Sequence, residues 1–115
     1  MASTGPERRR FPRRNCSLRI QLQAPELPFP TSCETTDISL CGCYIKLSFP
    51  LPVGTVLNVH IGTEDGEVRA LGVVRTSNPG LGNGIEFTEM TESNKLRLVQ
   101  CLEKLPDVDA PEFIP

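Results

Sequence analysis

The sequence predicts an all-β fold, a six-stranded antiparallel β-barrel followed by one C-terminal α-helix. Six short segments lie between turn residues, and most of them alternate apolar and polar positions, which is typical of half-buried strands. The last segment changes to helical spacing. A closed barrel is favoured because closure removes the exposed edges that six short strands would otherwise leave. The length of 115 residues indicates one domain.

The first half of the chain holds three of the expected strands. Residues 15–23 alternate strictly and predict a strand. The proline-rich stretch 24–32 predicts a loop, and residues 33–37 predict a short second strand. Residues 43–49 alternate again and predict the third strand.

The second half predicts three more strands and the helix. Residues 55–62 alternate, and Asp65-Gly66 is typical of a hairpin turn into a longer strand over 68–76, where Gly72 indicates a bend or bulge. A glycine-rich turn leads to the last strand at 85–90.

The C-terminal part of the chain predicts a helix with recognisable ends. Thr91 is the expected N-cap and Pro106 lies just past the end. The apolar positions at helical spacing are Leu98, Cys101, Leu102 and Leu105. We expect a disordered tail at 1–6, one domain over 7–105 and a flexible tail at 106–115.

Composition excludes several classes of protein. A net charge of −2 argues against a general nucleic-acid binder, which is usually basic. No apolar stretch approaches the ~20 residues of a membrane span, and no apolar run follows the N-terminal arginines, so neither membrane insertion nor a signal peptide is expected. Five cysteines, an odd number, indicate reduced thiols and a cytoplasmic location.

Neither a metal site nor an active site is indicated. Cys41-Gly42-Cys43 lacks the Cys-x-x-Cys spacing typical of zinc sites, and His60 is the single histidine. No set of nucleophile, base and acid with a familiar spacing is present, so an enzyme is not expected.

The charge is concentrated in one segment, RRRFPRR at residues 8–14. It holds five of the twelve basic residues. The guanidinium fork of arginine matches phosphate oxygens and the O6/N7 edge of guanine, and Arg9 and Arg13 are spaced to reach two such groups on one ligand. A solvated run of charge is the alternative. Clustered like charges repel, so residues 7–14 are expected to form a mobile arm.

A second polar stretch is DISLCG, from Asp37 to Gly42. A carboxylate at Asp37 can accept two donors at once, Ser39 adds a hydroxyl, and Gly42 permits a close approach of backbone or ligand. Taken alone, the stretch fits an ordinary turn as well, because Asp, Ser and Gly are turn residues.

Together the two stretches, Arg9-x-x-x-Arg13 followed by Asp37-x-Ser39-x-x-Gly42, resemble the PilZ domain, a receptor for cyclic di-GMP. The segment LGVVRTSNPGLGNGIEF resembles the distal half of that family. The resemblance covers residues 7–105 and implies a six-stranded barrel with a C-terminal helix.

The resemblance also implies roles for individual residues. Arg9 and Arg13 would clasp the phosphates and guanine edges of cyclic di-GMP. Asp37 and Ser39 would hydrogen-bond to it, and Gly42 would leave room for it. Three further candidates are Arg8, Arg75 and Gly84.

No cofactor is implied, and a downstream protein partner is expected because such a domain has no output of its own. Two alternatives remain, a PilZ-like interaction module that binds no nucleotide and a nucleic-acid binder that uses the arginine run.

Overall fold

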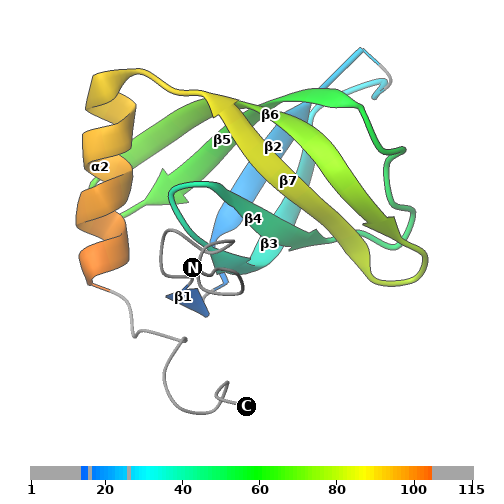
Figure 1. Cartoon of the computed structure of the whole chain (residues 1–115), viewed down its shortest axis with the longest axis horizontal. Coiled ribbons are helices and arrows are strands. Elements are labelled where there is room, and N and C mark those ends of the chain that lie inside the picture. Colours follow the sequence, from blue (N-terminus) through cyan, green and yellow to red (C-terminus); the bar gives the residue numbers. More distant parts are fainter. Residues whose placement is uncertain (1–13, 16, 26, 105–115) are drawn as a thin grey trace, which may run out of the picture.

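The computed structural model describes residues 14–104, apart from residues 16 and 26. Its elements are β1 (Arg14–Asn15), β2 (Arg19–Gln23), β3 (Thr31–Ile38), β4 (Gly42–Lys46), β5 (Val56–Thr63), β6 (Gly66–Asn78), β7 (Gly82–Glu89) and α2 (Glu92–Glu103). Neighbouring strands pair in the order β3-β2-β5-β6-β7-β4, and β4 pairs again with β3. The six strands therefore form a closed antiparallel barrel with a helix at one end, which confirms the predicted fold (Figure 1).

The first predicted strand is interrupted. Residues 15–23 were expected to form one strand, but β1 and β2 are separate and pair with the same edge of β3. Between them, the backbone N–H of Leu18 donates to the side-chain hydroxyl of Thr35 at 2.9 Å, and Thr35 N–H donates to Leu18 O at 3.0 Å. A side-chain oxygen thus takes the place of a backbone carbonyl in the ladder, which breaks the regular pairing.

The core fills the barrel with the inward residues of every ring strand. The alternation predicted for 55–62 is confirmed, since Leu57, Val59 and Ile61 are buried on β5. The alternation predicted for 43–49 is confirmed as far as Lys46, where β4 ends, since Cys43 and Ile45 are buried. The other buried apolar residues of the core cluster are Ile20, Leu22, Ile38, Leu51, Val68, Val74, Ile85, Leu98 and Leu102.

Strand bounds differ from the predictions mainly at loops. β3 begins at Thr31, inside the predicted loop, and β4 ends at Lys46. The bulge at Gly72 is confirmed by a register shift between Leu71 and Gly72. A Cβ at Gly72 would lie 2.8 Å from Ile85 Cγ2, so the bend needs a residue without a side chain.

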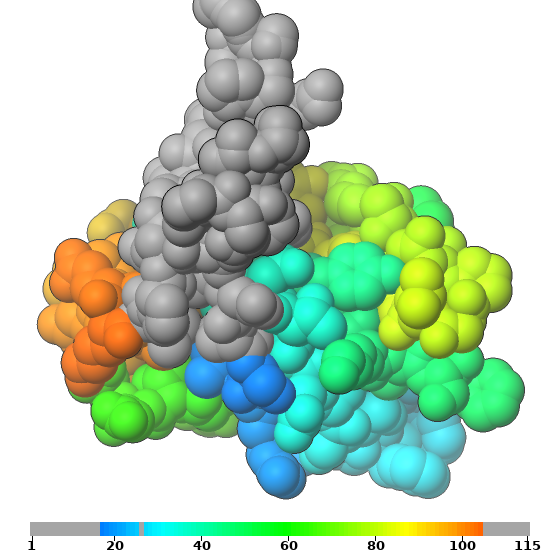
Figure 2. Space-filling view, turned by 90° about the horizontal axis from the view of Figure 1, so that it is seen from below, coloured from blue at the N-terminus to red at the C-terminus, as the bar shows by residue number. Residues whose placement is uncertain are grey.

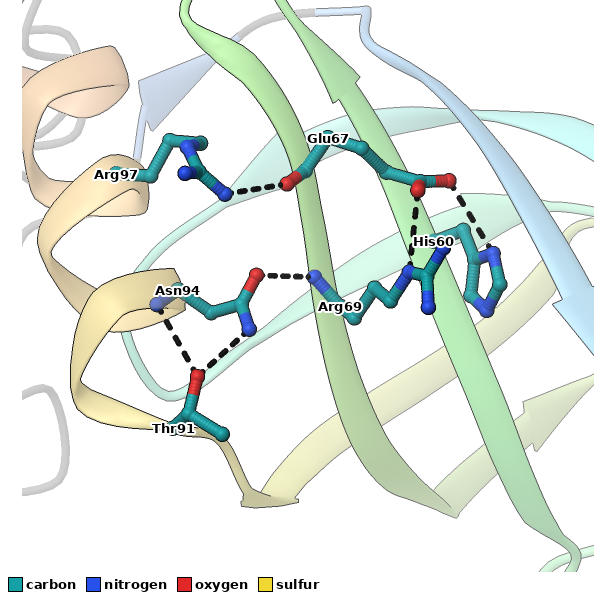
Figure 3. Close-up of polar contacts among 6 residues, drawn as sticks. All are labelled: His60, Glu67, Arg69, Thr91, Asn94 and Arg97. Atoms are coloured by element: carbon teal, nitrogen blue, oxygen red, sulfur yellow. Dashed lines mark hydrogen bonds and ion pairs between the residues drawn. The ribbon is translucent and has the colours of Figure 1, made fainter.

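The helix α2 is held against the β5–β6 hairpin. Thr91 is the N-cap, as predicted, and its hydroxyl accepts from Asn94 N–H. Asn94 Oδ1 in turn accepts from Arg69 N–H at 2.9 Å, and Arg97 donates to Glu67 O at 2.9 Å (Figure 3).

The far end of α2 is fixed by an ion pair and by burial. Lys104 Nζ lies 2.9 Å from Asp65 Oδ1, and this hydrogen bond raises the pKa of Lys104 above its usual value. Leu98, Cys101 and Leu102 pack inward as predicted, while Leu105 and Pro106 lie outside the described residues. In the described part of the chain, no helix is long and apolar enough to cross a membrane.

Candidate functional site

The segment Asp37 to Gly42 forms the turn between β3 and β4. Ser39 N–H donates to Gly42 O at 2.8 Å, and Ser39 Oγ accepts from Cys41 N–H at 3.1 Å. Ser39 is buried, with 5% of its surface exposed. In the structure as it stands, the hydroxyl therefore holds the turn rather than facing solvent.

Gly42 is required by the packing of β4 on β7. It pairs with Glu86 in register, and a Cβ there would stand 2.0 Å from Ile85 O, which is too close for any side chain. The sequence predicted that this glycine permits a close approach of either backbone or ligand. The structure shows the close approach of the β7 backbone.

Asp37 belongs to a row of residues that crosses four strands. It pairs with Tyr44 of β4, Tyr44 pairs with Gly84 of β7, and Gly84 pairs with Thr76 of β6. The strand neighbours of Asp37, Tyr44 and Gly84 include the buried residues Ile38, Ile45 and Ile85, and Thr76 itself is exposed, so the row lies on the outer face of the barrel.

Gly84 is required by the close packing at the centre of this row. A Cβ at this position would lie 2.5 Å from Thr76 Oγ1 and 3.7 Å from Tyr44 Cδ1, so the Thr76 hydroxyl occupies the place that a side chain would need. Gly84 N–H donates to Thr76 Oγ1 at 3.0 Å, and Tyr44 Oη donates to Asn78 Oδ1 at 2.7 Å.

Arg75 lies next to this row on β6. Its Nε donates to Glu86 Oε1 at 2.5 Å, and Glu86 is the register partner of Gly42. Arg75 and Glu86 are both about half exposed, so solvent screens the pair and its contribution to stability is small. The guanidinium is thereby held close to the β3–β4 turn.

The arginine-rich segment joins the barrel beside the same turn. Arg14 pairs with Ile38, and Asn15 pairs with Asp37. Arg8, Arg9 and Arg13, and nearly all of the predicted mobile arm over 7–14, lie outside the described residues. Residue 14 is where the arm ends, so the chain that carries these arginines is anchored next to Asp37.

A comparison with protein-family models finds a match over residues 7–104, and the matching family is described as the PilZ domain. The chain belongs to the PilZ domain family. PilZ domains are generally receptors or adaptors for cyclic di-GMP. A comparison with curated proteins finds no match to this chain.

Two solved structures share the PilZ fold with this chain. One is the PilZ domain of CeSA from a cellulose-synthesizing bacterium, with a TM-score of 0.64 and 14% identity over 80% of this chain and 95% of that one. The other is the Bacillus subtilis inhibitor of motility, MotI/DgrA, with a TM-score of 0.66 and 21% identity over 84% of this chain and 50% of that one. This PilZ chain thus spans about half the length of the second relative.

A pocket of about 200 Å³ opens between the β3–β4 turn of this PilZ domain, the end of β7 and the start of α2. The backbone closes one wall, because Phe87 N–H donates to Cys41 O at 2.8 Å. The lining residues are Leu40, Cys41, Glu86, Phe87, Thr88, Glu89, Met90 and Lys95. Carboxylates and apolar groups share this surface, which adjoins the turn that bears Ser39.

Metal ligands do not gather in the described part of the chain, where no three His, Cys, Asp or Glu side chains lie close enough to hold an ion. The four described cysteines are free thiols. Burial, with a smaller effect of the Glu34 carboxylate, raises the pKa of Cys33 to about 11, and burial also raises the pKa of Cys101.

Two members of the row, Tyr44 and Thr76, were not among the sequence candidates. The sequence predicts only that Tyr44 lies on the outer face of the third strand, because it alternates with Cys43 and Ile45. Its alignment with Asp37 depends on strand pairing between residues far apart in the chain.

Proposed function

We propose that this PilZ protein is a cytoplasmic receptor for cyclic di-GMP that acts as an adaptor. The arm at residues 7–14 would become ordered over the bound dinucleotide, and the changed surface would be read by a partner protein. The domain itself would carry out no catalysis.

The observation that carries the proposal is the pairing of β1 with β3. It joins Arg14 and Asn15, at the end of the arginine-rich segment, to the barrel beside Asp37, which supports a site shared by both halves of the motif. Without this pairing the two stretches would be separate features of the chain. A mobile basic segment anchored at a polar turn is suited to closing over a compact dianion.

The residues of this region would contact different parts of the ligand, according to their chemistry. Arg9 and Arg13 would bind phosphates and the O6/N7 edge of guanine through their guanidinium forks, with Arg8 in a supporting position. Asp37 would accept from the N1 and N2 donors of guanine, and the Ser39 hydroxyl would contribute if ligand binding released it from Cys41 N–H.

The outer face of the barrel would supply the floor of the site. Tyr44 is half-buried on this face, and its ring would offer a stacking surface for a base. Arg75 would bind from the adjacent strand after exchanging Glu86 for the ligand. Gly42 would keep the turn close to β7.

Isothermal titration with cyclic di-GMP and cyclic di-AMP tests the proposal. Adenine lacks the N1–H and N2 donors that Asp37 needs, so we expect clear preference for the guanine ligand, and Asp37→Ala should reduce that preference. Equal affinity for the two ligands would contradict the role of Asp37. No binding of either would favour an interaction module that does not use nucleotide.

A further inference from the structure

Three loops leave the barrel at the end opposite α2. They are the β2–β3 loop (24–30), the β4–β5 loop (47–55) and the β6–β7 turn (79–81). Figure 1 shows all three on the side of the molecule away from the helix. The β3–β4 turn, with Ser39, lies at the other end of these strands.

Each of the three loops exposes a large apolar side chain. The exposed fractions are 90% for Phe49, 68% for Phe29, 65% for Leu81 and 62% for Val53. Figure 2 shows these segments gathered at one end of the molecule, with α2 at the other. Single exposed apolar residues are ordinary, but four of them on three loops at one end are the kind of feature that marks interaction surfaces. We call these four residues the apolar loop end.

The loops beneath Phe49, Val53 and Leu81 are held in place by hydrogen bonds. Leu47 N–H donates to Leu81 O at 3.3 Å, and Gly54 N–H donates to Val74 O at 2.8 Å. The backbone of Leu51 is bound in both directions by the side chain of Asn83. A surface that is already ordered loses little conformational entropy on binding, which favours association.

The charge distribution favours a second copy of this chain as the occupant. Within the three loops only Glu26 is charged, although the chain has 12 basic and 14 acidic residues. Two copies that meet through these nearly uncharged ends meet with little repulsion between like charges. A two-fold contact also requires a self-complementary surface, and an apolar patch meets that condition.

The size of the patch sets the strength of the contact. The four side chains expose on the order of 500 Å² per copy, so a pair buries on the order of 1,000 Å², the lower limit for a specific interface. We propose that the apolar loop end mediates a two-fold homodimer that dissociates on dilution. The contact leaves the β3–β4 turn accessible, so it does not depend on the proposed ligand site.

The test is sedimentation velocity on the full chain over concentrations from about 10 μM to about 1 mM. The wild type should rise from its monomer mass of 12.7 kDa toward twice that value. Phe49→Glu and Leu81→Glu, on different loops, should each keep the chain monomeric over most of this range by raising the dissociation constant at least about tenfold.

Leu96→Glu is the matched control, because Leu96 is 60% exposed but lies on α2 at the other end. It should dimerise as the wild type does, and thermal melts should show that all three variants are folded. A wild type that stays monomeric throughout would overturn the proposal. A dimer that persists in both loop variants would also overturn it. So would a monomeric wild type that binds phosphatidylcholine vesicles when Phe49→Glu does not, because the apolar loop end would then contact lipid rather than a second copy.

Discussion

Asp37 on β3 lies directly opposite Tyr44 on β4, and both side chains are on the outer face of the barrel. The pair brings the carboxylate predicted for guanine recognition beside an aromatic ring whose other flank is a glycine. A polar acceptor next to a stacking surface is a combination that recognises a base by its edge and its face at once.

Replacing Tyr44 tests this pair within the proposed function. Tyr44→Ala removes the ring, and we expect affinity for cyclic di-GMP to fall roughly tenfold, since base stacking is worth about 1–3 kcal/mol. Tyr44→Phe keeps the ring and loses only the 2.7 Å bond to Asn78, so its affinity should stay near that of the wild type. Isothermal titration decides, and equal losses in both variants would mean that the hydroxyl matters rather than the ring.

Replacing arginines in the arm should separate binding from stability. In Arg9→Ala and Arg13→Ala we expect most affinity for cyclic di-GMP to be lost, because each removes charge-assisted contacts worth about 1.5–3 kcal/mol. The melting temperature without ligand should not change. Arg69→Ala, on the β5–β6 hairpin, serves as a control for total charge and should bind normally. A large fall in melting temperature in the arm variants would show that the arm is structural.

The salt dependence of binding distinguishes a dinucleotide receptor from a nucleic-acid binder. A single-stranded polyanion that contacts several phosphates should show a log–log slope of about −0.7 per phosphate. We expect a shallow slope for the two-phosphate ligand and no binding of generic oligonucleotides at physiological salt. Fluorescence anisotropy with both labelled ligands measures this. Tight, length-dependent oligonucleotide binding without competition from cyclic di-GMP would contradict it.

Asn83 should be important for stability. It is fully buried, and its side chain accepts from Leu51 N–H at 2.8 Å and donates to Leu51 O at 2.9 Å and Thr76 O at 3.1 Å. Asn83→Ala leaves buried backbone groups without these partners, so we expect a loss of at least about 2 kcal/mol in urea unfolding. The exposed Asn78→Ala should cost less than about 1 kcal/mol. Similar costs for the two would show that the loop does not depend on Asn83.

The thiols should react with iodoacetamide in an order set by exposure and pKa. In a Cys16→Ser background, Cys41 should be modified first because it is exposed. A pKa raised to about 11 leaves Cys33 about one part in a hundred thiolate at pH 9, so its reaction should be slow there and should accelerate as the pH approaches 11. Mass spectrometry after digestion reads the order. Fast labelling of Cys33 at pH 9 would contradict its burial.

Much of the fold could be predicted because its signals are local. The Asp65-Gly66 hairpin, the bulge at Gly72 and the Thr91 cap each depend on residues within a few positions, and all three are present. The interruption of the first strand could not be predicted in this way. It depends on the Thr35 hydroxyl meeting Leu18 from across the sheet.

In the candidate site, too, some features depend on local sequence and others on contacts between distant strands. Asp37, Ser39 and Gly42 were identified from their spacing, but the alignment of Asp37 with Tyr44, Gly84 and Thr76 arises from the register of four strands. The hold of Ser39 on Cys41 N–H is likewise a property of the folded turn. Whether these residues bind cyclic di-GMP stays a prediction.

The barrel ring closes through β2, β3 and β4 without using β1. The two-residue β1 ladder can therefore open while every ring contact remains in place, so its opening free energy should be far below that of global unfolding. Amide protons in the β1 ladder should accordingly exchange much faster than those of the β5–β6 ladder. Opening of the chain at residues 14 and 15 therefore need not expose the hydrophobic core, so such an opening should not lead to aggregation or proteolysis of the barrel.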